Sequence, residues 1–122
     1  MKLSIITATL NSEGTLRRCL DSVAVQTALN NIEHLIIDGG SEDETVGIAA
    51  EYPHVAYCVS QHDRGIYHAF NKGLAAATGD LLYFLNSDDY LYEETTVEEI
   101  IGQLSPDADF LCGRILVVNH MT

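Results

Sequence analysis

Basic residues are scarce in this chain, and their scarcity excludes several kinds of partner. Six lysines and arginines stand against 18 aspartates and glutamates among 122 residues, which gives a formal net charge of −12. A chain of this charge has no electrostatic means of holding nucleic acid or an anionic membrane nonspecifically. Local fields at a metal ion or at a helix N-terminus could still bind an anion.

Long apolar runs and cysteine patterns are also missing. No run of about 18 apolar residues exists, which excludes a membrane-spanning helix. The apolar residues 3–8 are too few, and follow too little basic sequence, to be a signal peptide. Cys19, Cys58 and Cys112 are widely spaced and form neither a disulfide framework nor a zinc pattern. Their apolar surroundings predict three buried thiols, and we expect a cytoplasmic protein.

The chain does contain an alternation of strand-like and helix-like segments. Its hydrophobic content of 47% is enough for one core, so we expect a single domain over residues 1–122. Strands are predicted at residues 3–8, 32–37, 54–60 and 81–85, with a last strand or hairpin within 110–118. This alternation indicates an α/β fold with a mainly parallel, Rossmann-like sheet flanked by helices.

Two helices are predicted in the first half of the chain from apolar residues at helical spacing. The first is expected to start from a cap at Asn11 or Ser12. Its apolar face consists of Leu16, Cys19, Leu20 and Val23. The second is expected to open at residues 41–44, which have the spacing of a capping box, and to end before Pro53.

Two further helices are predicted in the second half. One covers residues 65–77, with Tyr67, Phe70 and Leu74 on one face. Gly79 is expected to end it as a left-handed C-cap. The other is marked by apolar residues from Val97 to Leu104 and is closed by Pro106.

The most informative segment is residues 86–89, Asn-Ser-Asp-Asp, which follow the apolar strand 81–85. Adjacent carboxylates at the end of a strand are hard oxygen ligands that suit Mg²⁺ or Mn²⁺, and these ions bind phosphate oxygens. Ligands gather at the carboxyl edge of open α/β sheets. An Asp-rich turn without any ligand explains the same residues, so this segment alone leaves both interpretations open.

Two other segments are expected at the same edge. Residues 7–11 follow the first strand, and their small side chains would let a ligand approach, although a helix cap explains them too. Asp38 and two glycines follow the second strand. Asp38 could accept hydrogen bonds from a base or ribose hydroxyl, or the segment could be a tight turn. Neither a P-loop nor a dinucleotide-binding glycine pattern is present.

Polar residues also crowd positions 62–73. Arg64 and Lys72 are two of only six basic residues and are candidates for phosphate contacts, with surface ion pairs as the alternative. His68 and Asn71 could face a ligand or be hydrogen-bonded within the core.

Taken in order and spacing, these segments resemble the family 2 glycosyltransferases, which have the GT-A fold. The resemblance covers about residues 3 to 92 and is carried by positions 4–11, 19–27, 36–45, 63–74 and 78–89. The segment 63–74 is similar to a subgroup that builds bacterial polysaccharides. The resemblance implies a nucleotide-sugar donor, commonly a UDP-sugar, and a divalent cation, Mn²⁺ or Mg²⁺, as cofactor.

The resemblance also implies a role for individual residues. The implied nucleotide-sugar site consists of Ala8, Thr9, Asp38, Arg64, Asn71 and Asp88. The first two would lie against the base and ribose, and Asp38 would help to hold the nucleoside. Arg64 and Asn71 would border the pyrophosphate or the donor sugar. Asp88 and Asp89 would be the metal ligands.

The chain departs from the family pattern at three positions. Asn86 stands where many members have the first Asp of the metal motif, so metal binding would depend on Asp88 and Asp89. Gly39 stands where many members have an Asp that contacts the base, which leaves the nucleotide preference open. His68 stands where the similar subgroup usually has Asp, and its imidazole could alter the sugar pocket.

The implied reaction is inverting transfer of a sugar to a glycan or lipid-linked acceptor, whose hydroxyl must lose a proton to a general base. In the family this base is usually a carboxylate from a later segment, and no Asp or Glu follows Asp109 here. We therefore expect the base beyond Thr122 and the chain to be truncated at its C-terminus. The alternative is a short, non-catalytic module that binds a nucleotide-sugar.

Other classes fit less well. A phosphoacceptor receiver domain would place its Asp pair after the first strand, and a nucleotidyltransferase would need a glycine-rich basic first loop. Within the glycosyltransferase interpretation, a peripheral location at the inner face of the membrane stays open. Loss of a second half would expose apolar surface, so we also expect self-association.

Overall fold

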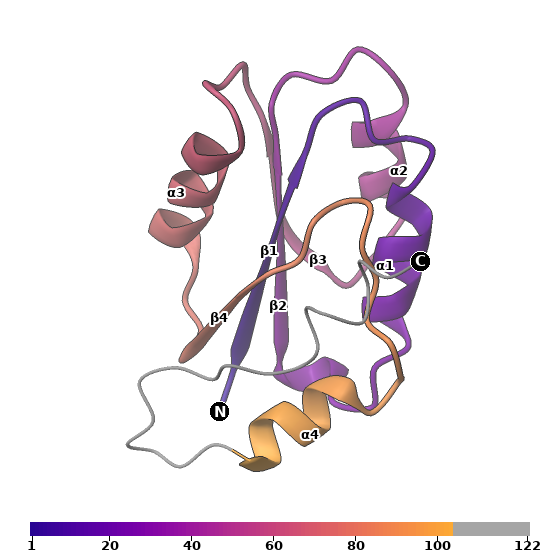
Figure 1. Ribbon diagram of the computed structural model, residues 1–122, viewed down its shortest axis with the longest axis vertical. Helices are drawn as coiled ribbons and strands as arrows, with labels where there is room; N and C mark the ends of the chain where they lie inside the picture. Colours follow the sequence, from indigo (N-terminus) through magenta and orange to yellow (C-terminus); the bar gives the residue numbers. More distant parts are fainter. Residues whose placement is uncertain (104–122) are drawn as a thin grey trace.

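The computed structural model describes residues 1–103 as an α/β domain built on one parallel sheet (Figure 1). The strand order is β3-β2-β1-β4. The strands are β1 (Leu3–Thr9), β2 (Ile32–Asp38), β3 (Val55–Ser60) and β4 (Leu81–Phe84). All three pairs of neighbours are parallel, so the four carboxyl ends lie at one edge. The predicted fold class is confirmed, and the strand predicted within 110–118 lies outside the described residues.

Helices cover both faces of the sheet (Figure 1). The helical elements are α1 (Leu16–Ala24), the 3₁₀ turn η1 (Leu29–Asn31), α2 (Thr45–Ala50), α3 (Ile66–Ala76) and α4 (Thr96–Gln103). Alternate residues of β1 point to opposite faces. Ile5 therefore packs in the core on the α1 and α2 side, and Ile6 packs with Ala69 of α3 on the other side. The predicted apolar face of the first helix is fully buried.

The first two helices start later than the sequence predicts. Ser12 does not cap α1; its carbonyl accepts hydrogen bonds from the backbone of Thr15 (3.1 Å) and Leu16 (2.9 Å) in a turn before the helix. Asn11 adopts a left-handed conformation with φ of 50°, which Asn tolerates better than most residues. The expected capping box of α2 does not form either, because Ser41 donates its hydroxyl to Asp38 (2.6 Å). These polar side chains join loops to one another.

The face of α3 that meets the sheet is formed by small residues. Ala69 and Gly73 are buried, whereas Tyr67 is 81% exposed and Leu74 41% exposed, so of the predicted apolar face only Phe70 packs against the core. A Cβ on Gly73 would run into the side chain of Ile6. The helix can therefore approach β1 closely only because residue 73 has no side chain.

Gly79 is not a left-handed cap, because the glycines with positive φ are Gly40 and Gly65. Its lack of a side chain serves a close approach: a Cβ there would lie 2.5 Å from the hydroxyl of Ser4 and 2.9 Å from its backbone nitrogen. The prediction of three buried thiols is also wrong for Cys58, which is exposed on the edge strand β3, while Cys19 is buried. Cys112 lies outside the described residues.

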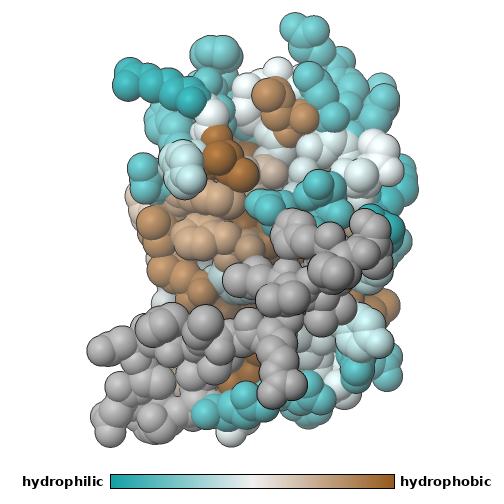
Figure 2. All heavy atoms as spheres, in the orientation of Figure 1, coloured by the Kyte–Doolittle hydropathy of each residue, from teal (hydrophilic) through white to brown (hydrophobic). Residues whose placement is uncertain are grey.

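Apolar side chains gather at the surface beside α3 and β4, on the left of the space-filling view (Figure 2). The exposed large residues on these two elements include Ile66, Leu74, Leu82 and Phe84. None of the helices within residues 1–103 combines the length and the apolar composition that crossing a membrane requires.

Candidate functional site

Asp38 organises the loops at the carboxyl edge of the sheet. It ends β2 opposite Thr9 of β1 and Ser60 of β3. Its carboxylate accepts hydrogen bonds from the hydroxyls of Thr9 (2.6 Å), Ser41 (2.6 Å) and Ser60 (2.8 Å). It also accepts from the backbone of Gly40 (3.0 Å) and Ser41 (2.8 Å). Five donors surround a side chain with no exposed surface.

This environment keeps Asp38 ionised. Burial opposes its charge, but the hydrogen bonds, those from Ser41 and Thr9 foremost, outweigh burial and hold the pKa of Asp38 below its ordinary value. Each carboxylate oxygen already has its partners. In this arrangement Asp38 shapes the loop around a ligand, and a direct bond to a nucleoside would have to replace one of the bonds it now makes.

Side-chain hydrogen bonds tie three loops together at this edge. The backbone of Asn11 donates to the hydroxyl of Ser41 (2.8 Å), which joins the loop after β1 to the loop after β2. The hydroxyl of Ser12 bonds that of Ser87 (2.9 Å), which joins the loop after β1 to the segment after β4. The sequence predicted that these segments meet, and the structure brings them together.

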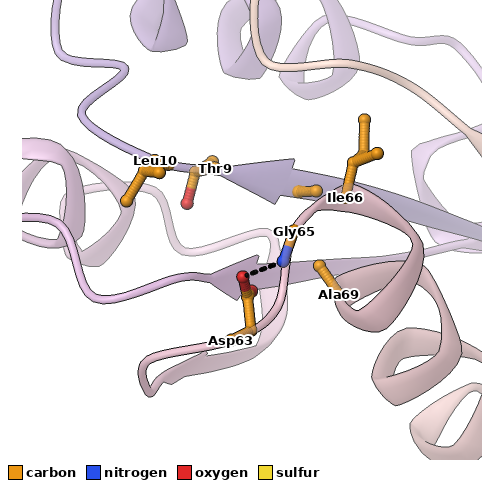
Figure 3. Close-up of a pocket in the computed structure, with 7 residues that line it drawn as sticks. Thr9, Leu10, Asp63, Gly65, Ile66 and Ala69 are labelled. Atoms are coloured by element: carbon orange, nitrogen blue, oxygen red, sulfur yellow. Dashed lines mark hydrogen bonds between the residues drawn. The ribbon is translucent and has the colours of Figure 1, made fainter.

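A pocket of about 220 Å³ opens between the end of β1 and the start of α3 (Figure 3). Its lining consists of Ala8, Thr9, Leu10, Asp63, Gly65, Ile66 and Ala69. Four of these seven residues, Ala8, Thr9, Gly65 and Ala69, are small. Gly65 has φ of 113°, a left-handed conformation that favours glycine and turns the chain into α3. Ala8 and Thr9, both predicted site residues, thus line the pocket.

Asp63 brings the one charged side chain into this lining. Its carboxylate accepts a hydrogen bond from the backbone of Gly65 (3.0 Å), drawn as a dashed line in Figure 3. A Cβ on Gly39 would lie 3.0 Å from both of its carboxylate oxygens. The space that a side chain at position 39 would use is therefore held by Asp63. Asp63 is not among the predicted site residues, although it belongs to the polar segment 62–73.

The two carboxylates after β4 lie in different environments. Residues 86–89 form a turn in which the backbone of Asp89 donates to the carbonyl of Asn86 (3.0 Å). Asp88 is exposed, whereas Asp89 is only 6% exposed. Burial raises the pKa of Tyr83 to about 12, and the charge of Asp89 adds to that rise. Asp89 therefore faces the interior near Tyr83, and Asp88 is the carboxylate open to solvent.

The described residues suit a metal ion that arrives with a ligand. Within residues 1–103, no three side chains of His, Cys, Asp or Glu gather into a preformed metal site. Mg²⁺ and similar ions commonly keep several waters and bind through one or two carboxylates plus substrate phosphates. The exposed carboxylate of Asp88 fits that kind of site. It does not fit a closed structural site.

The remaining predicted residues lie on α3 or just before it. Arg64 and Asn71 are exposed, and neither lines the pocket. The ring nitrogen Nδ1 of His68 accepts a hydrogen bond from the backbone of Arg64 (3.0 Å), so His68 ties down the turn that enters α3. The structure therefore brings Ala8, Thr9 and Asp38 together and leaves Arg64 and Asn71 at the periphery.

Comparison with known proteins relates this site to sugar transfer. A family model described as "Glycosyl transferase family 2" matches residues 4–122. A PGL/p-HBAD biosynthesis glycosyltransferase from Mycobacterium bovis (strain BCG / Pasteur 1173P2) is 40% identical over 121 residues, which cover 93% of this chain and 46% of that protein. The chain thus spans less than half the length of this relative.

Two solved structures share the fold. TarS 1–349 of S. aureus in complex with UDP-GlcNAc has a TM-score of 0.76 and 29% identity, over 84% of this chain and 30% of that one. Glucosyl-3-phosphoglycerate synthase from Mycobacterium tuberculosis, in complex with Mn²⁺, UDP and phosphoglyceric acid, has a TM-score of 0.64 and 25% identity, over 83% of this chain and 38% of that one.

Proposed function

The chain belongs to glycosyl transferase family 2, and we propose that it binds the nucleotide-sugar donor of an inverting glycosyltransferase. The donor would be a UDP-sugar, and the acceptor a glycan or a lipid-linked sugar. A similar protein from S. aureus holds UDP-GlcNAc, and one from M. tuberculosis holds UDP with Mn²⁺. We extend these ligand classes to this chain because its own loops supply the groups that such a ligand needs.

The observation that carries the proposal is the double contact of Ser12. Its hydroxyl accepts a hydrogen bond from the backbone of Leu10 (3.2 Å), which lines the pocket, and bonds the hydroxyl of Ser87 (2.9 Å), which precedes Asp88. These two bonds join the pocket and the segment of the exposed carboxylate into one hydrogen-bonded frame. A nucleoside in the pocket would direct its diphosphate along this frame toward Asp88.

Each part of the frame would contribute a separate function. Ala8 and Gly65 let a base and ribose approach the backbone, and Asp63 presents a hydrogen-bond acceptor that suits an N–H group of a base. Asp38 holds Thr9 and residues 40–41 in place. Asp88, with Asp89 behind it, would hold a Mn²⁺ or Mg²⁺ ion. Such an ion would neutralise the charge that grows on the leaving diphosphate.

Arg64, Asn71 and His68 would not contact a nucleoside bound in the pocket. Arg64 lies just before α3, His68 and Asn71 lie on it, and none of the three lines the pocket. Arg64 or Asn71 would reach a ligand only where the diphosphate and sugar extend beyond the pocket. We assign no general base among residues 1–103 and propose that it lies beyond Thr122, because the chain spans only 46% of the length of its M. bovis relative.

Calorimetric titration with UDP tests the proposal. We expect the wild-type chain to bind UDP at least about tenfold more tightly with Mn²⁺ than without it, which corresponds to about 1.4 kcal/mol. Asp88→Asn should abolish this gain. Asp80→Asn is the matched control, because Asp80 is an exposed aspartate that accepts a hydrogen bond from the backbone of Lys2 at the other end of β4. Equal UDP binding by the wild type and Asp88→Asn in Mn²⁺ would contradict the proposal.

A further inference from the structure

A polar stripe that runs along α1 and past its end holds the segment that carries the two carboxylates. Arg18 and Ser22 are four residues apart and lie on the same side of α1, and Gln26 follows two residues after the helix ends. Between β4 and α4, residues 85–95 form no helix or strand. The position of that segment therefore depends on contacts with its surroundings. The stripe formed by Arg18, Ser22 and Gln26 supplies several of these contacts.

Ser22 and Gln26 hold the segment after residue 90 by hydrogen bonds. The hydroxyl of Ser22 accepts from the backbone of Leu91 (2.9 Å). The amide of Gln26 donates to the carbonyl of Glu93 (2.7 Å) and accepts from the backbone of Val97 (3.0 Å). Val97 lies in the first turn of α4, where backbone N–H groups lack partners within the helix. Gln26 thus caps α4 from the side, and the segment after residue 90 is anchored.

Arg18 continues the stripe to the carboxylates. One of its nitrogens donates to the backbone carbonyl of Asp88 at 3.4 Å, and its guanidinium carbon lies 4.5 Å from the centre of the Tyr90 ring. The hydrogen bond is long, so the stacking on Tyr90 contributes more of the contact. These two contacts lie on either side of Asp89. Within residues 1–103, Arg18 makes no ion pair with a carboxylate.

We propose that Arg18 is a positioning residue for the metal-binding carboxylates, an inference that rests on the function proposed above. It holds the backbone carbonyl of Asp88 on one side of Asp89 and the Tyr90 ring on the other, and so sets the direction of the Asp88 side chain. Among residues 1–103 the contacts of Arg18 are a carbonyl and a ring, so Arg18 does not occupy the carboxylate of Asp88. A planar guanidinium can stack and donate at once, whereas a lysine ammonium cannot do both with the same geometry.

The test compares Arg18→Lys and Arg18→Met with the neighbouring Arg17→Met. Arg17 has the same side chain on the same helix, but it pairs with Glu51 (2.8 Å), away from the carboxylates. We expect both Arg18 variants to weaken UDP binding in Mn²⁺ about tenfold, the effect typical of a lost partner behind a metal ligand. UDP binding without metal should stay unchanged, and the melting temperature should change no more than in Arg17→Met.

Hydrogen exchange gives a readout that needs no nucleotide. In the full chain, amides of residues 86–90 should exchange faster in both Arg18 variants than in the wild type and Arg17→Met. Unchanged exchange would overturn the inference. If Arg18→Lys binds UDP in Mn²⁺ as tightly as the wild type does, the inference is also overturned, because a positive charge at residue 18 would then be enough without the stacked guanidinium.

The same data separate this inference from the proposed function. A wild-type chain whose UDP binding ignores Mn²⁺ would contradict the proposed function and, with it, the role of Arg18. A wild-type chain that needs Mn²⁺, together with Arg18 variants that need it equally and bind as tightly, would contradict the role of Arg18 alone.

Discussion

Gly73 offers the sharpest test of how α3 is placed against the sheet. A Cβ at this position would overlap Cγ2 of Ile6 and lie 3.1 and 3.2 Å from its Cδ1 and Cγ1 atoms. Ile6 is fully buried and packs against Leu35, Ile37 and Ala69, so it has no room to move aside. Gly73→Ala should therefore push α3 away from β1, and with it the pocket wall at Ala69.

Two opposing effects determine how much Gly73→Ala changes the free energy of unfolding. Alanine improves helix propensity over glycine by about 1 kcal/mol. Overpacking a rigid core costs about 1–3 kcal/mol, and the overlap with Ile6 places this site at the upper end. We expect Gly73→Ala to lower the free energy of unfolding by about 1–2 kcal/mol, measured by urea denaturation at constant pH.

Gly47 in α2 is the matched control. It is exposed, and a Cβ there would meet only the end of the Glu44 side chain, at 3.4 Å. Gly47→Ala should stabilise the chain by about 0.5–1 kcal/mol. In an Ile6→Ala background, Gly73→Ala should become neutral or stabilising, a coupling of about 1 kcal/mol or more. If Gly73→Ala stabilises the wild type as much as Gly47→Ala does, the close approach of α3 is refuted.

Three further predictions concern the polar groups. Asp38→Asn should lower the free energy of unfolding by about 2–4 kcal/mol in urea denaturation, because an amide cannot accept from all five donors. Burial and the nearby His54 lower the pKa of His34 to about 3. Since free histidine titrates near pH 6.5, stability should be complete above pH 6.5 and fall as the pH drops toward 3, by up to about 1.4 kcal/mol per unit. A His34→Gln variant should show a shallower fall in urea midpoint; an equal fall would contradict this assignment. Gly39→Ala should displace Asp63 and weaken UDP binding in calorimetry as much as Asp63→Ala does, and undiminished binding would exclude Asp63 from the donor site.

The sheet could be predicted from the sequence because its signals are local and strong. Runs of apolar, β-branched residues mark β1 and β2, and Asp38 is the polar residue that ends β2. Parallel strands place their carboxyl ends together, so the meeting of the loops after β1, β2 and β4 followed from topology alone. The burial of Leu16, Cys19, Leu20 and Val23 followed from their helical spacing.

The loops could not be predicted in the same way, because Ser, Asp and Asn serve both as helix caps and as bridges between loops. Ser12 and Ser41 match a capping pattern, yet they bond Ser87 and Asp38, partners that are remote in sequence or outside the expected helix. The difference between Asp88 and Asp89 has the same origin. Adjacent residues in a turn point in different directions, and only the fold decides which one faces the interior.

Asp63 could not be predicted as a lining residue of the pocket, because the position of its carboxylate depends on Gly39, 24 positions away in the chain. The absence of a side chain at Gly39 is what makes room for the Asp63 carboxylate. Compensation between a missing side chain on one loop and an existing one on another leaves no local pattern in a single sequence. The segment 62–73 pointed to the region, while the close approach of the two loops identified the residue.

We propose above that a divalent cation binds at Asp88 together with a nucleoside diphosphate in the neighbouring pocket. The most direct measurement is the paramagnetic broadening of amide signals by Mn²⁺ in an isotopically labelled chain, with UDP present. We expect selective broadening at residues 86–89 and at Thr9 and Leu10, whereas signals around Asp80, at the opposite edge of the sheet, should stay sharp. In Asp88→Asn this selective pattern should be lost. Broadening spread over the many exposed carboxylates, or a selective pattern that Asp88→Asn retains, would contradict this proposal.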